Sequence, residues 1–474
     1  MLGLFGSLNM ASRSLQTQMT GVEVAGQNLA NINTTGYSRQ RVQIATSTDL
    51  STGLGQQGTG ATAVAIQQVV SSLLNNQIQG QQSVSSYWSA QQSTLQSAQT
   101  DLNEFLDGTG STDSTSASSD STSSSGLSGQ LSGLFSAFSS LATSPTSLTA
   151  RQAVVNQAQN LASTFNQISS QLTQMQSSLN ASVGTDVSSA NEQLSNIAGL
   201  NQQITFAEFG GGNANDLLDE REQALENLSQ LTDITTSTET SGAVDVSIGG
   251  QTLVSGGQVL DTLQTYDAGS GNLLVQTASG TNLTLAGGSI QGTIDARDGT
   301  LATLQNNVST LASNLITQVN TVHGGGYSLT GSTGADFFSG TDAATITVNA
   351  ALVNNPSLVQ ASGDATATGD NSVALSLAQL DDTTQSGLND ESFSDYYSQS
   401  VAELGNALST ANTQVTDQTS VSTMLATQRS SISGVSVDEE MTNLMGFQRA
   451  YEASAQLVTT INTLMGDTLA MKAS

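Results

Sequence analysis

The sequence contains no cysteine, one histidine and only nine basic residues in 474. Without cysteine it can form no disulfide, no thiolate nucleophile and no cysteine-ligated metal site. His323 alone cannot build a multi-histidine metal site, although a lone histidine could still act as a general base. No stretch reaches the ~18–20 apolar residues of a membrane-spanning helix. Residues 1–10 have neither the basic start nor the apolar length of a cleaved signal peptide.

The shortage of basic residues leaves the chain strongly acidic, with 38 Asp and Glu residues against 9 Lys and Arg and a net charge of −29. Contacts to nucleic-acid phosphates need clusters of Lys and Arg, and no basic run occurs. The same shortage argues against docking on anionic lipid. We therefore expect neither a nucleic-acid partner nor a membrane partner.

Apolar residues at alternating spacings of three and four run through the first 32 residues. A seam of about four heptads is typical of a helix that pairs in a coiled coil. The helix should end at the turn signal Asn33–Gly36, because Gly adopts positive φ easily. We predict assembly contacts on this helix at Leu8, Leu15, Val22, Leu29 and Ile32.

The C-terminus mirrors this pattern. Ser436 with Glu439 has the spacing of a capping box, and a helix should run from there to about Met471. The two terminal helices could pair with each other or with other subunits, or they could be ordinary helices packed on a globular core. We predict assembly contacts on the C-terminal helix at Met441, Leu444, Tyr451, Val458 and Met465.

Between the ends, the periodicity indicates a mainly α fold with inserted β structure. Helical spacing predicts helices over about 65–106, 127–141, 149–179 (with a Thr149/Gln152 capping box), 186–208, 216–231, 298–319 and 391–430. The length indicates two to four domains at ~100–200 residues each. The predicted domains are a terminal coiled coil (1–45 with 433–474), a helical rod (46–231 with 296–432, with a flexible Ser/Thr loop at about 108–126), a small β domain (232–295) and a short β or irregular insertion (327–385).

Two segments could suggest chemistry. His323–Gly326 matches the HGGG oxyanion motif of lipase-like hydrolases, but the chain has no G-x-S-x-G elbow and no second histidine for a triad. We interpret it instead as a helix end, with a left-handed glycine cap and a histidine at the negative end of the helix. The acids between Asp216 and Glu226 have helical rather than calcium-loop spacing, which favours a solvated helix face. We thus expect no catalytic, cofactor or metal site, and no enzyme.

The segment Gly26–Gln40 (GQNLANINTTGYSRQ) resembles the N-terminal signature of the flagellar axial proteins, the rod, hook and hook-associated proteins. Its Ser-Arg-Gln ending is similar, within that family, to the hook-associated protein 1 group. Further segments resemble stations of the same group in the same order: Ala150–Val154, Asn215–Glu222, Gln291–Asp298, Val319–His323, Gly334–Phe338 and Ile432–Glu440.

This resemblance implies a structural subunit of the bacterial flagellum at the hook–filament junction. It implies self-association into a ring, contact with hook protein and with the next hook-associated protein, and a cytoplasmic export chaperone on the C-terminal helix. It further implies export without a cleaved signal peptide and an extracellular location. Terminal segments of such proteins are disordered before assembly. The alternatives are another axial subunit, hook or flagellin-like, or a secreted adhesin with Ser/Thr-rich spacers.

Overall fold

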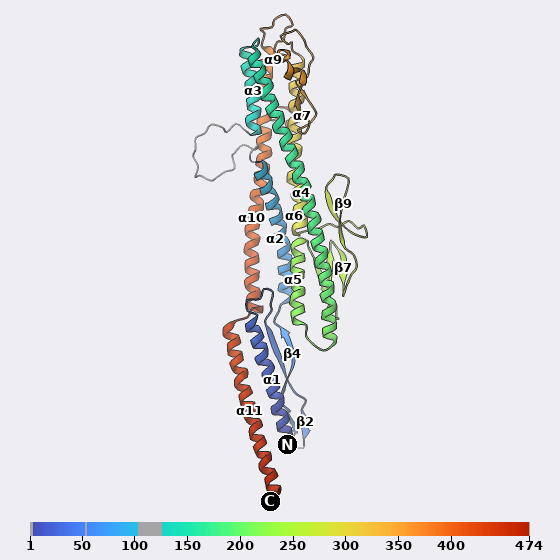
Figure 1. Cartoon of the computed structure of the whole chain (residues 1–474), viewed down its shortest axis with the longest axis vertical. Coiled ribbons are helices and arrows are strands. Elements are labelled where there is room, and N and C mark those ends of the chain that lie inside the picture. Colours follow the sequence, from blue (N-terminus) through green and yellow to red (C-terminus); the bar gives the residue numbers. More distant parts are fainter. Residues whose placement is uncertain (1–2, 53–54, 103–125, 474) are drawn as a thin grey trace.

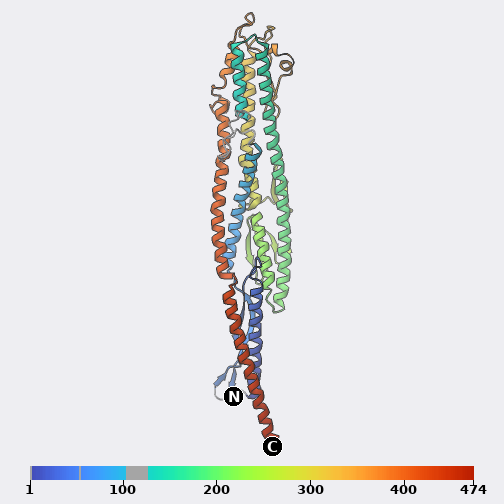
Figure 2. The same ribbon diagram turned by 60° about the vertical axis from the view of Figure 1, so that its left-hand side comes forward.

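The computed structural model describes residues 3–52, 55–102 and 126–473. The molecule is elongated, and its long helices run mostly along one axis (Figures 1 and 2). Both chain ends lie at the same end of the molecule (Figure 1). The fold is mainly α with small inserted sheets, which confirms the predicted fold class. None of the helices in the described ranges is long and apolar enough to cross a membrane.

The lower end is formed by the terminal helices, α1 (Leu4–Ala30) and α11 (Val437–Ala473), which pack side by side (Figures 1 and 2). An antiparallel hairpin, β1 (Gln40–Thr46) with β4 (Ala61–Gln68), lies along α1, and β2 (Leu50–Thr52) pairs with β3 (Gly55–Gln57) at its far end. This hairpin corrects two predictions. The segment 46–68 packs on α1 rather than belonging to the rod, and the helix expected from 65 begins only at Ser72.

The rod consists of long helices that pack lengthwise. The predicted helices 149–179 and 186–208 are in fact one helix of 62 residues. It continues through Gly184 because Val183 and Val187 are buried on either side of that glycine. Its N-cap is Ser147, whose Oγ accepts from the Ala150 amide, and not Thr149. The rod helices are α2 (Ser72–Leu102), α3 (Leu127–Thr143), α4 (Leu148–Phe209), α5 (Asn215–Leu231), α6 (Gly288–Ala296), α7 (Ala302–Gly324, after a π-helical turn at Arg297–Leu301) and α10 (Phe393–Ser433).

A small β unit packs on the lower half of α4. Its first sheet has the strand order β5-β6-β7-β8, all antiparallel, and a separate hairpin follows. Val244, Val246 and Ile248 are buried in alternation, as their spacing predicts. The strands are β5 (Thr235–Thr238), β6 (Val244–Ile248), β7 (Gln251–Ser255), β8 (Gln258–Val259), β9 (Leu263–Asp267) and β10 (Leu273–Thr277).

At the upper end of the rod, short helices, strands and loops pack against the main hydrophobic core. The predicted β or irregular stretch 327–385 also contains two short α-helices that the pattern did not reveal. The predicted flexible loop at about 108–126 lies, apart from Gly126, outside the described residues. The upper elements are β11 (Phe338–Ser339), β12 (Thr347–Val348), α8 (Ala350–Asn354), α9 (Ser372–Gln379) and the 3₁₀ turns Pro356–Leu358 and Ser386–Leu388.

Candidate assembly site at the terminal helices

The two terminal helices form an antiparallel pair with a seven-residue contact repeat. Three contacts define the register: Asn28 with Glu440, Gly21 with Phe447, and Ser14 with Ser454. Each step moves seven residues back along α1 and seven forward along α11. The next step would place Ser7 opposite Ile461, which is only 4% exposed. A heptad repeat of this kind is the geometry of a coiled coil.

The closest approach occurs at Gly21. A Cβ added to this residue would lie 2.6 Å from Cδ1 of Phe447, well inside contact distance. Ser14 and Ser454 meet through their hydroxyls at 3.0 Å. Small residues on α1 therefore allow the bulky ring on α11 to pack against the α1 backbone.

The predicted contact residues of α1 lie one position away from this line of contacts. Leu8, Leu15, Val22 and Leu29 are each half-buried rather than central. Ile32 lies beyond the helix, since Asn31 ends it. On α11, the residues predicted as contacts divide into two sets: Leu444, Val458 and Met465 are half-buried, whereas Met441 and Tyr451 are exposed.

Sequence reasoning missed Ser14, Gly21 and Asn28 as contact residues, whereas helical spacing had placed Phe447 in the seam. The signal available for them was the spacing of seven among Ser7, Ser14, Gly21 and Asn28. That spacing is not an apolar pattern, so a search for apolar residues passes over it.

Asn28 connects the helix pair to the chain that follows α1. Its side chain is buried and all its hydrogen-bonding groups are used. Nδ2 donates to the Gln40 carbonyl at 2.8 Å and to Glu440 Oε2 at 3.1 Å. Oδ1 accepts from the Tyr37 hydroxyl at 2.8 Å and from the Gln40 amide at 2.9 Å. The Asn of the family signature is thus the point at which both chain ends and β1 meet.

Below the rod, the linker between α1 and β1 forms hydrogen bonds both to the chain around the start of α11 and to α5 of the rod. The Arg39 amide donates to the Ser433 carbonyl at 2.8 Å, and the Arg39 guanidinium pairs with Glu439 at 2.5 Å. The Ser38 amide donates to Asp219 Oδ2 at 3.0 Å. These contacts set the position of the terminal pair against the rod.

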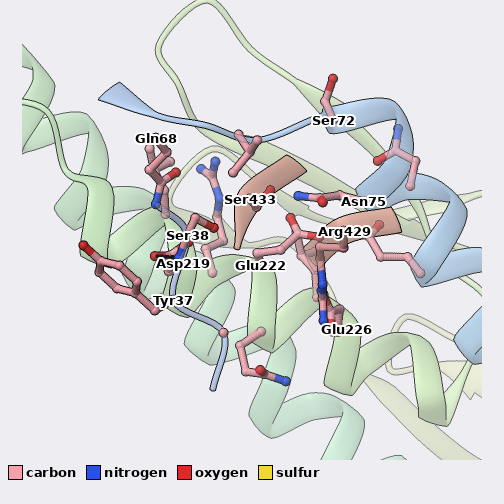
Figure 3. Close-up of a pocket in the computed structure, with 18 of the residues that line it drawn as sticks. Tyr37, Ser38, Gln68, Ser72, Asn75, Asp219, Glu222, Glu226, Arg429 and Ser433 are labelled. Atoms are coloured by element: carbon pink, nitrogen blue, oxygen red, sulfur yellow. Dashed lines mark hydrogen bonds and ion pairs between the residues drawn. The ribbon is translucent and has the colours of Figure 1, made fainter. Parts of the chain in front are cut away.

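Figure 3 shows this joint, a cavity of about 460 Å³ lined by the α1–β1 linker, the start of α2, α5 and the end of α10. Glu222 accepts from Gln79 Nε2 at 2.9 Å, and Glu226 forms an ion pair with Arg429. The α5 acids Asp219, Glu222 and Glu226 are half-buried here. The predicted solvated helix face is therefore wrong for these three residues. Asp219 bonds the α1–β1 linker, whereas Glu222 and Glu226 bond α2 and α10 of the rod. Asp216 and Glu220 are exposed.

Burial also changes the acid–base properties of the joint. It raises the pKa of Tyr37 to about 12, with further contributions from the charges of Asp216, Asp219 and Glu440. Burial likewise raises the pKa of Asp219 and that of Glu222, against hydrogen bonds that lower it. The carboxylates that lie close together here accept hydrogen bonds from a backbone amide, a glutamine and an arginine, and these bonds favour their charged forms.

His323 lies far from this joint, in the core of the rod's upper end. Its Nδ1 is 2.8 Å from the Ala335 carbonyl, and its Nε2 accepts from the Gln360 amide at 2.9 Å. Gln360 N can only donate, so the ring is neutral with its proton on Nδ1. The predicted left-handed cap is wrong, because the capping residue Gly325 has φ −78°. His323 does lie in the last turn of α7, as predicted, and burial lowers its pKa to about 4.

The buried arginines in the segments that resemble the axial family hold loops to helices. Arg151 donates through Nε to the Pro145 carbonyl at 3.0 Å and also bonds the Val359 carbonyl. Arg297 binds the Leu273 carbonyl at 2.9 Å, which attaches β10 to the rod. No group of three or more potential metal-ligating side chains occurs among the described residues. These buried arginines attach a loop and a strand to the rod helices through hydrogen bonds.

Two family models match the chain. The helical domain of flagellar hook-associated protein FlgK matches residues 116–338, and the C-terminal domain of the flagellar basal body rod FlgEFG proteins matches residues 426–471. Flagellar hook-associated protein 1 of Bacillus subtilis (strain 168) is 28% identical over 513 aligned positions, covering 98% of this chain and 98% of that protein. Over nearly its whole length, the chain is similar to flagellar hook-associated protein 1.

Other proteins of the same name are less similar to this chain. The Escherichia coli (strain K12) protein is 25% identical over 387 positions, covering 60% of this chain and 70% of that protein. A solved structure, the flagellar hook junction protein FlgK from Burkholderia pseudomallei, has a TM-score of 0.63 at 18% identity, covering 76% of this chain and all of that one. At that identity the likeness establishes the shared fold.

Proposed function

We propose that the chain is a structural subunit of the bacterial flagellum that forms the junction between hook and filament, assembled through its terminal helices. The observation that carries this is the heptad-spaced antiparallel pair of α1 and α11, which brings both chain ends together at one end of a long rod (Figure 1). The similarity to flagellar hook-associated protein 1 supports the place of assembly. The match of residues 426–471 to the C-terminal domain of rod proteins supports a place among the axial proteins of the flagellum.

The helix pair leaves apolar surface uncovered. Met441, Tyr451, Leu457 and Leu464 on α11 are exposed, as is Met19 on α1. Leu8, Leu15, Val22 and Leu29 are half-buried beside the seam. Apolar surface at such density on a terminal domain is typical of an interaction site. We assign it to contacts between neighbouring copies in a ring, with hook protein on one side and the next hook-associated protein on the other.

The same surface supports the remaining parts of the proposal. An amphipathic helix such as α11 can lie in the groove of an export chaperone in the cytoplasm. A single pair of helices gains most of its stability from packing, so the termini should order fully only on assembly. As a part of the flagellum, the protein is placed outside the cell by this proposal.

The test uses flagella from cells that produce only a variant chain. Leu29→Asp or Val458→Asp places a charge beside the seam and should prevent incorporation, leaving hooks without filaments. Val458→Ile is the matched control, because it keeps an apolar side chain at the same position. The rod should melt at an unchanged temperature in all three variants. Normal filaments on cells with either Asp variant would refute the proposed role of the terminal helices.

A further inference from the structure

The terminal unit, made of α1, β1 to β4 and α11, shares no hydrophobic cluster with the rod in the described ranges. The chain passes from this unit to the rod at residues 69–71 and returns at residues 434–436 (Figure 1). Two crossing points leave the unit free to turn about the line that joins them. Directional hydrogen bonds are therefore left to set the angle between the two parts.

Gln40, the first residue of β1, is buried between the terminal helices and the rod. Its amide donates to Asn28 Oδ1 at 2.9 Å, and its carbonyl accepts from Asn28 Nδ2 at 2.8 Å. Asn28 in turn donates to Glu440 of α11. The Gln40 side chain reaches α5, where Oε1 accepts from Asn215 Nδ2 at 3.2 Å and Nε2 donates to Asp216 Oδ1 at 3.1 Å. The backbone and the side chain of this one residue thus connect the terminal pair with the rod.

Asn215, the first residue of α5, holds both strands of the hairpin that lies along α1. Besides Gln40 on β1, its Nδ2 binds the Ile66 carbonyl on β4 at 2.9 Å. Its own carbonyl accepts from Gln68 Nε2 at 2.5 Å. Asn215 is buried, and buried polar groups rarely remain without a partner. The hairpin is therefore held on α5 in the one orientation that satisfies these groups.

The two residues come from segments that the sequence analysis singled out and that no role has yet explained. Gln40 ends the segment Gly26–Gln40, and Asn215 begins the segment Asn215–Glu222. They are 175 residues apart in the chain and yet bond each other directly. Buried hydrogen-bond networks of this kind specify one arrangement of the groups that they join.

We propose that Gln40 and Asn215 are positioning residues that together set the angle of the rod on the terminal pair. The proposal rests on the proposed function, because this angle decides how the rods of neighbouring copies are arranged in the ring. Without the bridge between Gln40 and Asn215, the terminal pair keeps its own seam contacts. The rod then turns about the two crossing points.

Spin labels on two engineered cysteines measure this angle, because the chain has no cysteine of its own. One label replaces Gln203 on α4 and the other replaces Thr463 on α11, both of which are exposed. Thr463 lies about 39 Å along α11 from the joint, so a turn of roughly 10° moves its label by about 7 Å. The distance is measured by pulsed electron paramagnetic resonance in flagella where excess parent chain dilutes the labelled chain. Only distances within one chain are then recorded, and the labelled parent should give one narrow distribution.

Two substitutions break the bridge from its two sides. Asn215→Ala removes the side-chain bonds to both strands, and Gln40→Met keeps the length of the side chain but removes its amide. Each should broaden the distance distribution by roughly 7 Å or more while the rod melts at the parent temperature. The double variant should broaden it no further, because both residues act through one bridge.

The matched control is Asn227→Ala, which changes an asparagine of the same helix. Its amide oxygen accepts from Gln223 of α5 and not from the terminal unit. This variant should give the distribution of the labelled parent.

A variant that does not enter flagella is measured as purified chain. Ser14→Cys/Ser454→Cys, whose parent hydroxyls lie 3.0 Å apart, joins the terminal helices by a disulfide and keeps the pair closed. Small-angle X-ray scattering should give Asn215→Ala a smaller radius of gyration than the parent with the same disulfide, because a bent molecule is more compact.

The outcomes separate the two proposals. A distribution unchanged in either single variant, a broadening that adds up in the double variant, or an unchanged radius of gyration would overturn the positioning role. Absence of the parent chain from isolated flagella would instead refute the proposed function. The scattering of the purified chain would then still decide whether the bridge sets the angle.

Discussion

His323 offers a quantitative test of the rod's packing. The ring is completely buried, donates from Nδ1 to the Ala335 carbonyl and accepts at Nε2 from the Gln360 amide. Protonation would place a second hydrogen on Nε2, facing a donor. Burial lowers the pKa of His323 to about 4 from 6.5, while the Ala335 bond and Asp336 act to raise it and Arg151 acts to lower it.

The direction in which the stability changes with pH follows from the difference between the pKa of His323 in the folded and unfolded chain. The unfolded chain takes up this proton near pH 6.5, whereas the folded chain does so only near pH 4. The neutral ring therefore contributes stability that is fully present above pH 6.5 and is lost as the pH falls towards 4. Each pH unit within that window costs about 1.4 kcal/mol, so the loss between pH 7 and pH 5 should be about 2 kcal/mol.

The comparison variant is His323→Asn, whose amide can still donate to the Ala335 carbonyl but does not titrate. Trp88 is the only tryptophan and packs against the same core, so its fluorescence reports urea unfolding there. At pH 7 the parent should be the more stable, by about 1–3 kcal/mol for the lost acceptor. That advantage should shrink by about 2 kcal/mol at pH 5. An advantage independent of pH would refute the assignment of a buried neutral ring.

Three further predictions concern the terminal pair. Gly21→Ala should cost about 1–3 kcal/mol through its clash with Phe447 and reduce incorporation into flagella, while the control Gly26→Ala, which meets open space, should incorporate normally. Asn28→Ala should leave the buried Glu440 without its amide donor, at about 1–3 kcal/mol, and lower the temperature at which filaments detach; an unchanged temperature would contradict this. Protease should remove roughly the first 40 and last 40 residues from purified monomer and leave the rod intact, and resistance of both ends would exclude ordering on assembly.

The elements that could be predicted from the sequence are those whose residue pattern lies within the element itself. Both terminal helices, α5, the strand alternation at Val244–Ile248 and the absence of a hydrolase elbow could be read from spacing alone. The resemblance of Gly26–Gln40 to axial proteins then indicated the hook-associated proteins, to which the comparisons also show similarity.

Features that depend on distant partners could not be read in this way. The β1–β4 hairpin was missed because its strands are polar on one face and pair across a long connection. The break expected before residue 186 does not occur, because burial of Val183 and Val187 outweighs the ~1 kcal/mol that Gly184 costs a helix.

The residues through which α1 contacts α11 could not be predicted from the sequence of α1 alone either. The apolar column at Leu8, Leu15, Val22 and Leu29 marks a surface of the helix, but the partner's register decides which column lies closest. In this protein the small and polar column that includes Ser14, Gly21 and Asn28 faces α11. A single helix carries no information about where Phe447 and Glu440 will meet it.

The most direct test of the central claim is immunogold electron microscopy of intact flagella with an antibody against the rod. The account predicts a single band of label where hook meets filament. Label along the hook, along the filament or over the cell surface would contradict the junction role and favour a hook subunit, a flagellin-like subunit or an adhesin respectively.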